Sequence, residues 1–175
     1  DTCRAEARAA CGSDHLLAGF MGTGIFEQCH FLMGFEDTLT NLYAHPDEMH
    51  ALIDYIMEYR LTYVRMLIDH LQPDVIFSHD DWGTKNALFM KPEMWREFFK
   101  EPYRRFYGYI RSRGVIAIYH ADSYLVPIVD DMAGIGIQVW QGVLPENDIP
   151  ALQAHLNGRL TLMGGFGAAI DRKDA

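Results

Sequence analysis

Two short stretches of the chain place a histidine and carboxylates directly after apolar runs. The first is Ser78-His79-Asp80-Asp81-Trp82-Gly83. Two adjacent acids cannot both be buried and charged at low cost, so Asp80 and Asp81 are expected to face water or to hold a cation, a substrate hydroxyl or an amine. Lys85 is near enough in sequence to act as a counter-charge. We therefore predict that His79, Asp80 and Asp81 are catalytic. Trp82, which follows them, is expected to contact the substrate.

The second stretch is His120-Ala121-Asp122-Ser123. In an extended chain residues i and i+2 point the same way, so His120 and Asp122 could converge on one ion or one substrate. A histidine nitrogen with a carboxylate oxygen suits zinc or another divalent metal, although two ligands do not complete a site. The alternative is that Asp122 or Ser123 caps the helix that follows. His120 is thus predicted to be catalytic, and His120 with Asp122 is predicted to bind metal.

Glycines follow the first apolar run, in Gly19-Phe20-Met21-Gly22-Thr23-Gly24. They allow either a tight turn or a close approach of the backbone at Gly22 to a substrate. The stretch is neither a Walker loop nor a Gly-x-Gly-x-x-Gly fingerprint. Downstream, Glu27 and His30 are three residues apart and could share a helical face. A surface pair is one interpretation, and a substrate contact by His30 is the other.

Two polar residues near the fourth apolar run are further candidates for substrate contacts. Gln141 stands at the end of that run, and Glu146 follows in Pro145-Glu146-Asn147-Asp148. Acids at this place also suit the positive end of a helix, so Glu146 and Asp148 have a purely structural interpretation as well.

Five apolar runs predict the strands that must position these residues. They are near-continuous rather than alternating, which is typical of a parallel sheet covered on both faces; the runs are Leu16–Met21, Asp74–Ser78, Val115–His120, Gly136–Gln141 and Leu160–Gly164. Helical patterns separate them, so the chain is expected to be one α/β domain over residues 1–175 with right-handed crossovers. An open doubly wound sheet and a closed barrel both fit, and in either one function lies at the carboxyl ends of the strands.

The helical patterns have recognisable ends. A long helix is predicted from Pro46 until Pro73 ends it, and another from Pro92 to about Arg113, with a kink or break at Pro102. Shorter helices are expected after Asp122, to about residue 133, and after Pro145, to about residue 156. The last residues, 171–175, resemble the start of another helix. Both ends of the chain look cut.

Composition excludes several classes of protein. Of the 175 residues, 49% are hydrophobic and 22% are charged, which is typical of a globular chain. The net charge of −9 argues against binding to nucleic acid or to an anionic membrane, since both need clustered cations. No apolar run is long enough to span a membrane. The three cysteines fit neither a disulfide framework nor a metal motif, and free thiols indicate a cytoplasmic protein.

Several segments together resemble the uroporphyrinogen decarboxylase superfamily, which includes the cobalamin- and corrinoid-dependent methyltransferases. The similar segments are Gly19-Phe20-Met21-Gly22, Leu42-Tyr43-Ala44-His45-Pro46, residues 91–98 and Arg159-Leu160-Thr161-Leu162-Met163-Gly164-Gly165. The resemblance implies a (β/α)₈ barrel, present here as an incomplete fragment of about strands three to seven. It also implies a full-length protein roughly twice as long, with part of the site elsewhere, so that the isolated fragment is expected to be inactive.

The resemblance to the decarboxylases is weaker than that to the methyltransferases. His30 replaces the decarboxylase tyrosine, and the decarboxylase serine falls near Asp80. Acidic strand ends would also repel a polycarboxylate porphyrin substrate. The methyltransferases carry His-x-Cys-Gly, in which His and Cys bind zinc. The matching segment here keeps His120 and replaces Cys by Asp122.

The resemblance therefore implies an enzyme that moves a methyl group between a small methylated compound or acceptor and a corrinoid on a partner protein. His120 and Asp122 would bind zinc or polarise the substrate, and His79, Asp80 and Asp81 would orient it or manage protons. One alternative is decarboxylation of a tetrapyrrole such as uroporphyrinogen. Another is a non-catalytic barrel that binds a corrinoid or another ligand.

Overall fold

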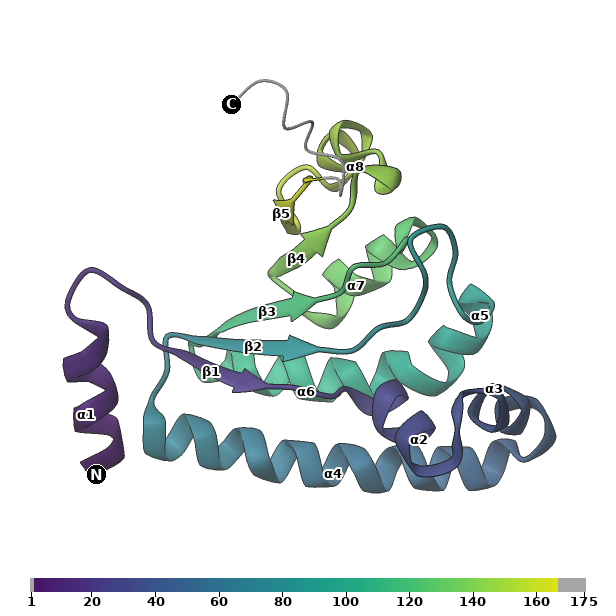
Figure 1. Ribbon diagram of the computed structural model, residues 1–175, viewed down its shortest axis with the longest axis horizontal. Helices are drawn as coiled ribbons and strands as arrows, with labels where there is room; N and C mark the ends of the chain where they lie inside the picture. The colour runs from purple at the N-terminus through teal and green to yellow at the C-terminus, as the bar shows by residue number, and fades with distance from the viewer. Residues whose placement is uncertain (1, 167–175) are drawn as a thin grey trace, which may run out of the picture.

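The computed structural model describes residues 2–166, which form a five-stranded sheet with helices between the strands. All neighbouring strands are parallel and follow one another in chain order (Figure 1). The strands are β1 (Ala18–Met21), β2 (Val75–His79), β3 (Ile116–His120), β4 (Val139–Val143) and β5 (Thr161–Gly164). Each lies within or beside one of the five predicted apolar runs.

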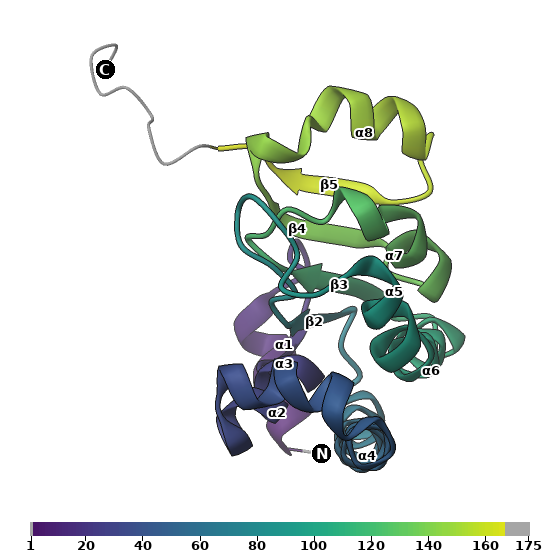
Figure 2. The same cartoon turned by 90° about the vertical axis from the view of Figure 1, so that its right-hand side faces the viewer.

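The strand order distinguishes between the two architectures that the sequence left open. A doubly wound sheet reverses its order at a switch point and carries helices on both faces. Here each crossover adds the next strand on the same side, and α4, α6 and α7 all lie on one face of the sheet (Figure 2). The structure is thus a run of five β/α units of a barrel, and the predicted (β/α)₈ fragment is confirmed.

The crossover from β1 to β2 contains three helices, α2 (Ile25–Met33), α3 (Phe35–Ala44) and α4 (Pro46–Leu71). Pro46 opens α4, with Asp47 and Glu48 in its positively polarised first turn. It ends at Gln72, which adopts a left-handed conformation with φ of 49°, directly before Pro73. The long helix is therefore confirmed at both ends. A further helix, α1 (Thr2–Cys11), precedes β1.

The crossover from β2 to β3 is irregular just before Pro102. It runs through α5 (Pro92–Trp95), a π-helical turn η1 (Arg96–Lys100) and α6 (Glu101–Ser112). Proline lacks the N–H that an α-helix needs and its ring crowds the preceding turn, so a wider π-turn accommodates it. The helix thus deforms instead of breaking.

Shorter helices complete the fold, and two predicted strand starts were wrong by two residues or more. The helices are η2 (Val126–Ile128), α7 (Val129–Ile135), η3 (Pro145–Asn147) and α8 (Ile149–Leu156). The fourth strand does not begin at Gly136, because that residue ends α7 with a left-handed φ of 106°. The first strand begins at Ala18, not Leu16. The helix expected at residue 171 lies outside the described residues.

The two faces of the sheet have different surroundings. On one face Ile76, Tyr119 and Trp140 are fully buried. They belong to the same hydrophobic core as Phe106 and Ile110 of α6. The opposite face is not covered by α4, α6 or α7, and it corresponds to the interior of a closed barrel (Figure 2). One register layer of this face is apolar and joins Phe20, Phe77, Ile118 and Val139 across β1 to β4. No described helix is long and apolar enough to cross a membrane.

Candidate active site at the carboxyl edge of the sheet

A row of side chains on the uncovered face crosses the carboxyl edge of the sheet. The parallel register pairs His79 with His120, His120 with Gln141, and Gln141 with Met163. This row lies two residues beyond the apolar layer, so it faces the same side. The rings of His79 and His120 are 5.0 Å apart, and His120 stacks on Phe77 at 5.9 Å. Two histidines predicted from separate stretches are therefore neighbours.

Gln141 fixes the orientation of His120. The Nδ1 atom of His120 is hydrogen-bonded to Oε1 of Gln141, an amide oxygen that can only accept. Nδ1 therefore carries the proton, and in a neutral ring the lone pair is left on Nε2. Metal-binding histidines are commonly oriented in this way by a partner on the second nitrogen.

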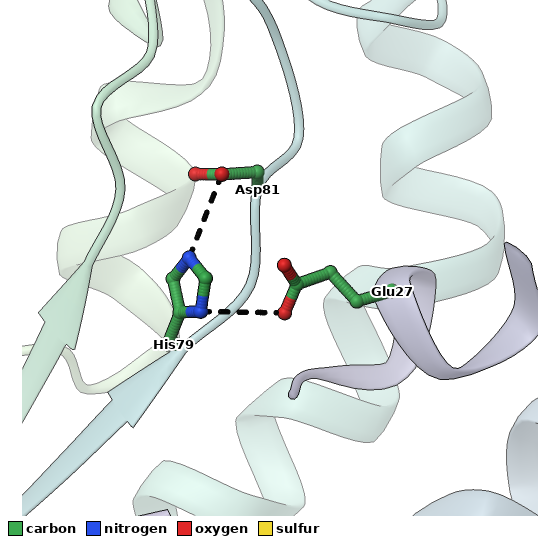
Figure 3. Close-up of side chains that lie close together, drawn as sticks. All are labelled: Glu27, His79 and Asp81. Atoms are coloured by element: carbon green, nitrogen blue, oxygen red, sulfur yellow. Dashed lines mark ion pairs between the residues drawn. The ribbon is translucent and has the colours of Figure 1, made fainter. Parts of the chain in front are cut away.

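His79 lies between two carboxylates (Figure 3). Its Nδ1 is 3.4 Å from Oε2 of Glu27, and its Nε2 is 3.5 Å from Oδ2 of Asp81. The side chains of Glu27, His79 and Asp81 are 13%, 27% and 41% exposed, so a small ligand can reach the cluster. A neutral imidazole has a single N–H, so one of the two carboxylates would face a lone pair. A positive charge among the three groups would satisfy both carboxylates.

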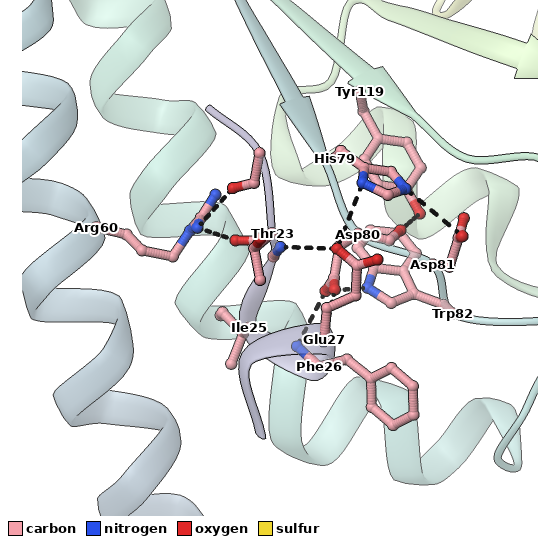
Figure 4. A network of polar contacts seen from close by, with 12 residues as sticks. Thr23, Ile25, Phe26, Glu27, Arg60, His79, Asp80, Asp81, Trp82 and Tyr119 are labelled. Carbon is pink, nitrogen blue, oxygen red and sulfur yellow. Dashed lines mark hydrogen bonds and ion pairs between the residues drawn. The ribbon is translucent and has the colours of Figure 1, made fainter. Parts of the chain in front are cut away.

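Asp80 points the opposite way and is buried in the core (Figure 4). Its carboxylate accepts hydrogen bonds from the backbone N–H groups of Phe26 and Glu27, at 3.1 and 2.9 Å. The Trp82 indole and the Tyr103 hydroxyl also donate to it, at 2.7 and 2.5 Å. Burial raises the pKa of Asp80 to about 6, and these hydrogen bonds, led by that of Tyr103, oppose the rise. Asp80 therefore caps α2 from another element of the fold.

Gly24 makes this cap sterically feasible. It is the N-cap of α2, and a Cβ added there would overlap the side chain of Asp80, 2.5 Å from its Oδ1. The backbone N–H of Gly24 also donates to Oε2 of Glu27 at 3.2 Å. Asp80 and Gly24 together fix the first turn of α2, and this turn aims Glu27 at His79.

Arg60 of α4 holds the turn that precedes α2. It is buried, and its Nη1 donates to the carbonyl of Gly22 at 3.2 Å and to that of Thr23 (Figure 4). Thr23 has a left-handed φ of 43°, so the turn is tight. Gly22 was predicted to contact a substrate. In the structure its carbonyl accepts a hydrogen bond from Arg60 within this turn.

The other predicted residues lie apart from the row. Trp82 is fully buried and stacks on Tyr119, with ring centroids 4.4 Å apart. His30 packs edge-on against Phe26 and Phe31. Glu146 lies in η3, beside a hollow of about 450 Å³ that α7 and α8 also line. The structure places none of these three with His79.

Asp122 is exposed and follows the row by two residues. Its Oδ1 would lie 2.5 Å from a Cβ added at Gly142, so it closely approaches the backbone after Gln141. Neither Asp122 nor Ser123 caps the next helix, because Ser123 donates to the Gly83 carbonyl at 2.8 Å and η2 has no side-chain cap. The capping alternative is therefore wrong for these residues. Asp148 does cap α8, through Ala151 N–H at 3.4 Å.

Two residues that matter here were missed or misplaced by sequence reasoning. Glu27 does not form a surface pair with His30, because its carboxylate faces His79 instead. Arg60 was not singled out, although a lone arginine among Ile56, Met57 and Leu61 on the apolar face of α4 was a visible signal. Lys85 is exposed and forms no salt bridge within residues 2–166, so the predicted counter-charge role was wrong, and His79 takes that place.

The fold is part of a β/α barrel with a row of polar side chains at its strand ends. Residues 3–170 match the model of the uroporphyrinogen decarboxylase (URO-D) family, and the chain belongs to this family. Among solved structures it is similar to a methyltransferase from Methanosarcina mazei, with 20% sequence identity and a TM-score of 0.75. The match covers 93% of this chain and 46% of that chain, so this chain spans about half of the neighbour's length. No curated protein sequence matches significantly.

Proposed function

We propose that this chain forms part of a methyltransferase, which moves a methyl group between a small methylated compound or acceptor and a corrinoid carried by a partner protein. The orientation of His120 is the observation that carries the proposal. It occupies the strand end at which methyltransferases of this family are expected to bind zinc, and Gln141 leaves its Nε2 free to act as a ligand.

Zinc would fit beside His120 and Asp122 by the chemistry of the donors. A bound zinc ion would activate a thiol acceptor or polarise the oxygen or nitrogen that carries the methyl group. Asp122 replaces a thiolate in this proposal, and a further ligand would come from another part of the protein. Within residues 2–166 no third His, Cys, Asp or Glu completes a cluster with this pair.

His79 is suited to proton transfer in the same reaction. When a methyl group leaves an oxygen or nitrogen, that atom gains electron density and needs a proton. The two ring nitrogens of His79 face the carboxylates of Glu27 and Asp81, at 3.4 and 3.5 Å, and its ring centroid is 5.0 Å from that of His120, so these groups can pass a proton to the substrate. Asp80 acts as a positioning residue in this scheme, since it holds the helix that carries Glu27.

Tetrapyrrole decarboxylation is a weaker candidate because of charge. Glu27, Asp81 and Asp122 all lie at or beside the candidate site, and they would repel the carboxylates of a porphyrinogen. A non-catalytic corrinoid-binding barrel would not need a group that transfers protons beside His120. Both alternatives give distinct results in the assay below.

The test uses the full-length protein with a reduced corrinoid protein and a panel of methyl ethers and methylamines. Transfer is followed by the absorbance change as the corrinoid is methylated. We expect His120→Ala and His79→Ala to reduce the rate at least 100-fold, and His155→Ala, at an exposed His–Asp pair, to leave it unchanged. Turnover of uroporphyrinogen instead would refute the proposal, and tight corrinoid binding without turnover would favour the non-catalytic barrel.

A further inference from the structure

We propose that Glu27, His79 and Asp81 form a divalent metal site of their own, distinct from the pair His120 and Asp122. The proposal stands on the geometry of the three side chains and does not depend on methyl transfer. A bound ion would take the place of a proton on His79, so water on that ion would then be the proton donor in place of His79 itself. It names different ligands from those expected at the neighbouring strand end.

The three donors converge from separate elements. Glu27 lies in the first turn of α2, His79 ends β2, and Asp81 follows in the next loop (Figure 3). One ligand atom from each lies within 4.8 Å of the others, whereas atoms that share one zinc ion lie no more than about 4.2 Å apart, so a small rotation that turns one nitrogen of His79 toward both carboxylates would complete the site. Within residues 2–166, this is the single group of three or more His, Cys, Asp or Glu side chains that lie close enough together to hold a metal ion.

The ligand types select the class of metal. One imidazole nitrogen with two carboxylate oxygens suits Zn²⁺, Mn²⁺ or Fe²⁺, whereas Ca²⁺ and Mg²⁺ prefer oxygen ligands alone. Three protein ligands also leave a position for water or substrate, as in catalytic zinc sites. A site of this kind at the mouth of a barrel can bind the heteroatom of a small substrate.

The charges of the cluster are not balanced by arginine or lysine. Within the described chain, His79 is the basic side chain that pairs with both Glu27 and Asp81. By contrast, Asp130 pairs with Arg159 as well as with His155. With the imidazole neutral, as a metal ligand must be, the two carboxylates carry two negative charges, and a divalent ion balances them.

The hydrogen bonds around the donors also favour a metal. Oδ1 of Asp81 is buried and has no hydrogen-bond partner, although a buried carboxylate oxygen without a partner is costly. The other carboxylate is held in place, because Oε2 of Glu27 accepts from Gly24 N–H and the Glu27 backbone is fixed by Asp80. Outer partners of this kind are typical of metal ligands.

The test measures metal binding to metal-free full-length protein, with Co²⁺ as a spectroscopic probe and Zn²⁺ in competition with a chromogenic chelator. We expect Glu27→Gln, His79→Ala and Asp81→Asn each to weaken binding of one Co²⁺ equivalent by at least about 100-fold, which exceeds the effect of losing an outer partner. The matched control is His155→Ala, which removes a histidine from a carboxylate pair that has an arginine. Circular dichroism checks that each variant is folded.

The same titration distinguishes the alternatives. Loss of that Co²⁺ equivalent in His120→Ala and Asp122→Asn, but not in His79→Ala, would place the metal at the neighbouring pair and overturn the proposal. Absence of Co²⁺ and Zn²⁺ binding, with NMR showing both ring nitrogens of His79 protonated at neutral pH, would leave an ion triad instead. Neither result uses a methyl donor, so failure here is separable from failure of the methyltransferase proposal.

Discussion

Replacing Gly24 by alanine should be among the most damaging single substitutions in the described chain. The added Cβ would stand 2.0 Å from both Cβ and Cγ of Asp80. Ordinary contact needs about 3.5 Å, so the side chain must retreat by roughly 1.5 Å. Its hydrogen bonds to Phe26 and Glu27, now 3.1 and 2.9 Å long, would then be lost. Hydrogen bonds to a charged group contribute about 1.5–3 kcal/mol each, so we expect a loss of about 3–6 kcal/mol in the free energy of unfolding.

The assay is urea unfolding of wild type and variant, followed by circular dichroism and extrapolated to water. Gly134→Ala is the matched control. It lies in α7 with no atom within 4 Å of the added Cβ, so alanine should be neutral or stabilise by up to about 1 kcal/mol. If Gly24→Ala loses less than about 1 kcal/mol, Asp80 does not cap α2 as described here.

Three other changes test neighbouring parts of the site. The pKa of Asp80 is about 6 in the folded chain and 3.8 ordinarily. Between pH 3.8 and about 6, the folded protein therefore binds one more proton than the unfolded chain does. Stability should therefore fall by up to about 3 kcal/mol as pH rises from 4 to 7, and Asp80→Asn should remove this slope in urea unfolding at several pH values. Arg60→Met keeps the apolar stem but loses the hydrogen bonds to the turn after β1, so we expect the free energy of unfolding to fall by about 2–4 kcal/mol. Thermal unfolding measures this change, and an unchanged melting temperature would contradict it. Gln141→Leu should release Nδ1 of His120, so nitrogen NMR should show a mixture of tautomers, whereas a single Nδ1–H form would show that another group sets it.

The fold was largely predictable because buried parallel strands and capped helices leave local signals. The apolar runs and Pro46 of α4 are of this kind. The strand order was not predictable, since it depends on which neighbour each strand pairs with and not on its own residues. The π-turn before Pro102 lies between these cases: the proline indicates a disturbance but not its form.

Side-chain direction explains what sequence reasoning found and missed at the site. The alternation that was applied to His120 and Asp122 also applies after β2, where His79 and Asp81 face one side and Asp80 the other. Asp80 was grouped with them because it is polar and adjacent in sequence. Apart from Trp82, its partners come from positions 26, 27 and 103, and no local pattern connects these three to it. Glu27 was assigned to the wrong partner for the same reason, since a contact between distant elements aims it at His79.

The two register layers of the uncovered face confine chemistry to one end of the barrel. Phe20, Phe77 and Ile118 form an apolar layer in register, and His79 and His120 stand directly above it on the carboxyl side. Water or a polar ligand gains no hydrogen bonds in the lower layer, so ligands should bind at the row. Phe20 is 64% exposed in this chain, which means that further residues must cover the lower layer before the row becomes the floor of a closed site. The polar side chains of this row therefore form one wall of the proposed site, and the residues opposite them would decide which substrate it accepts.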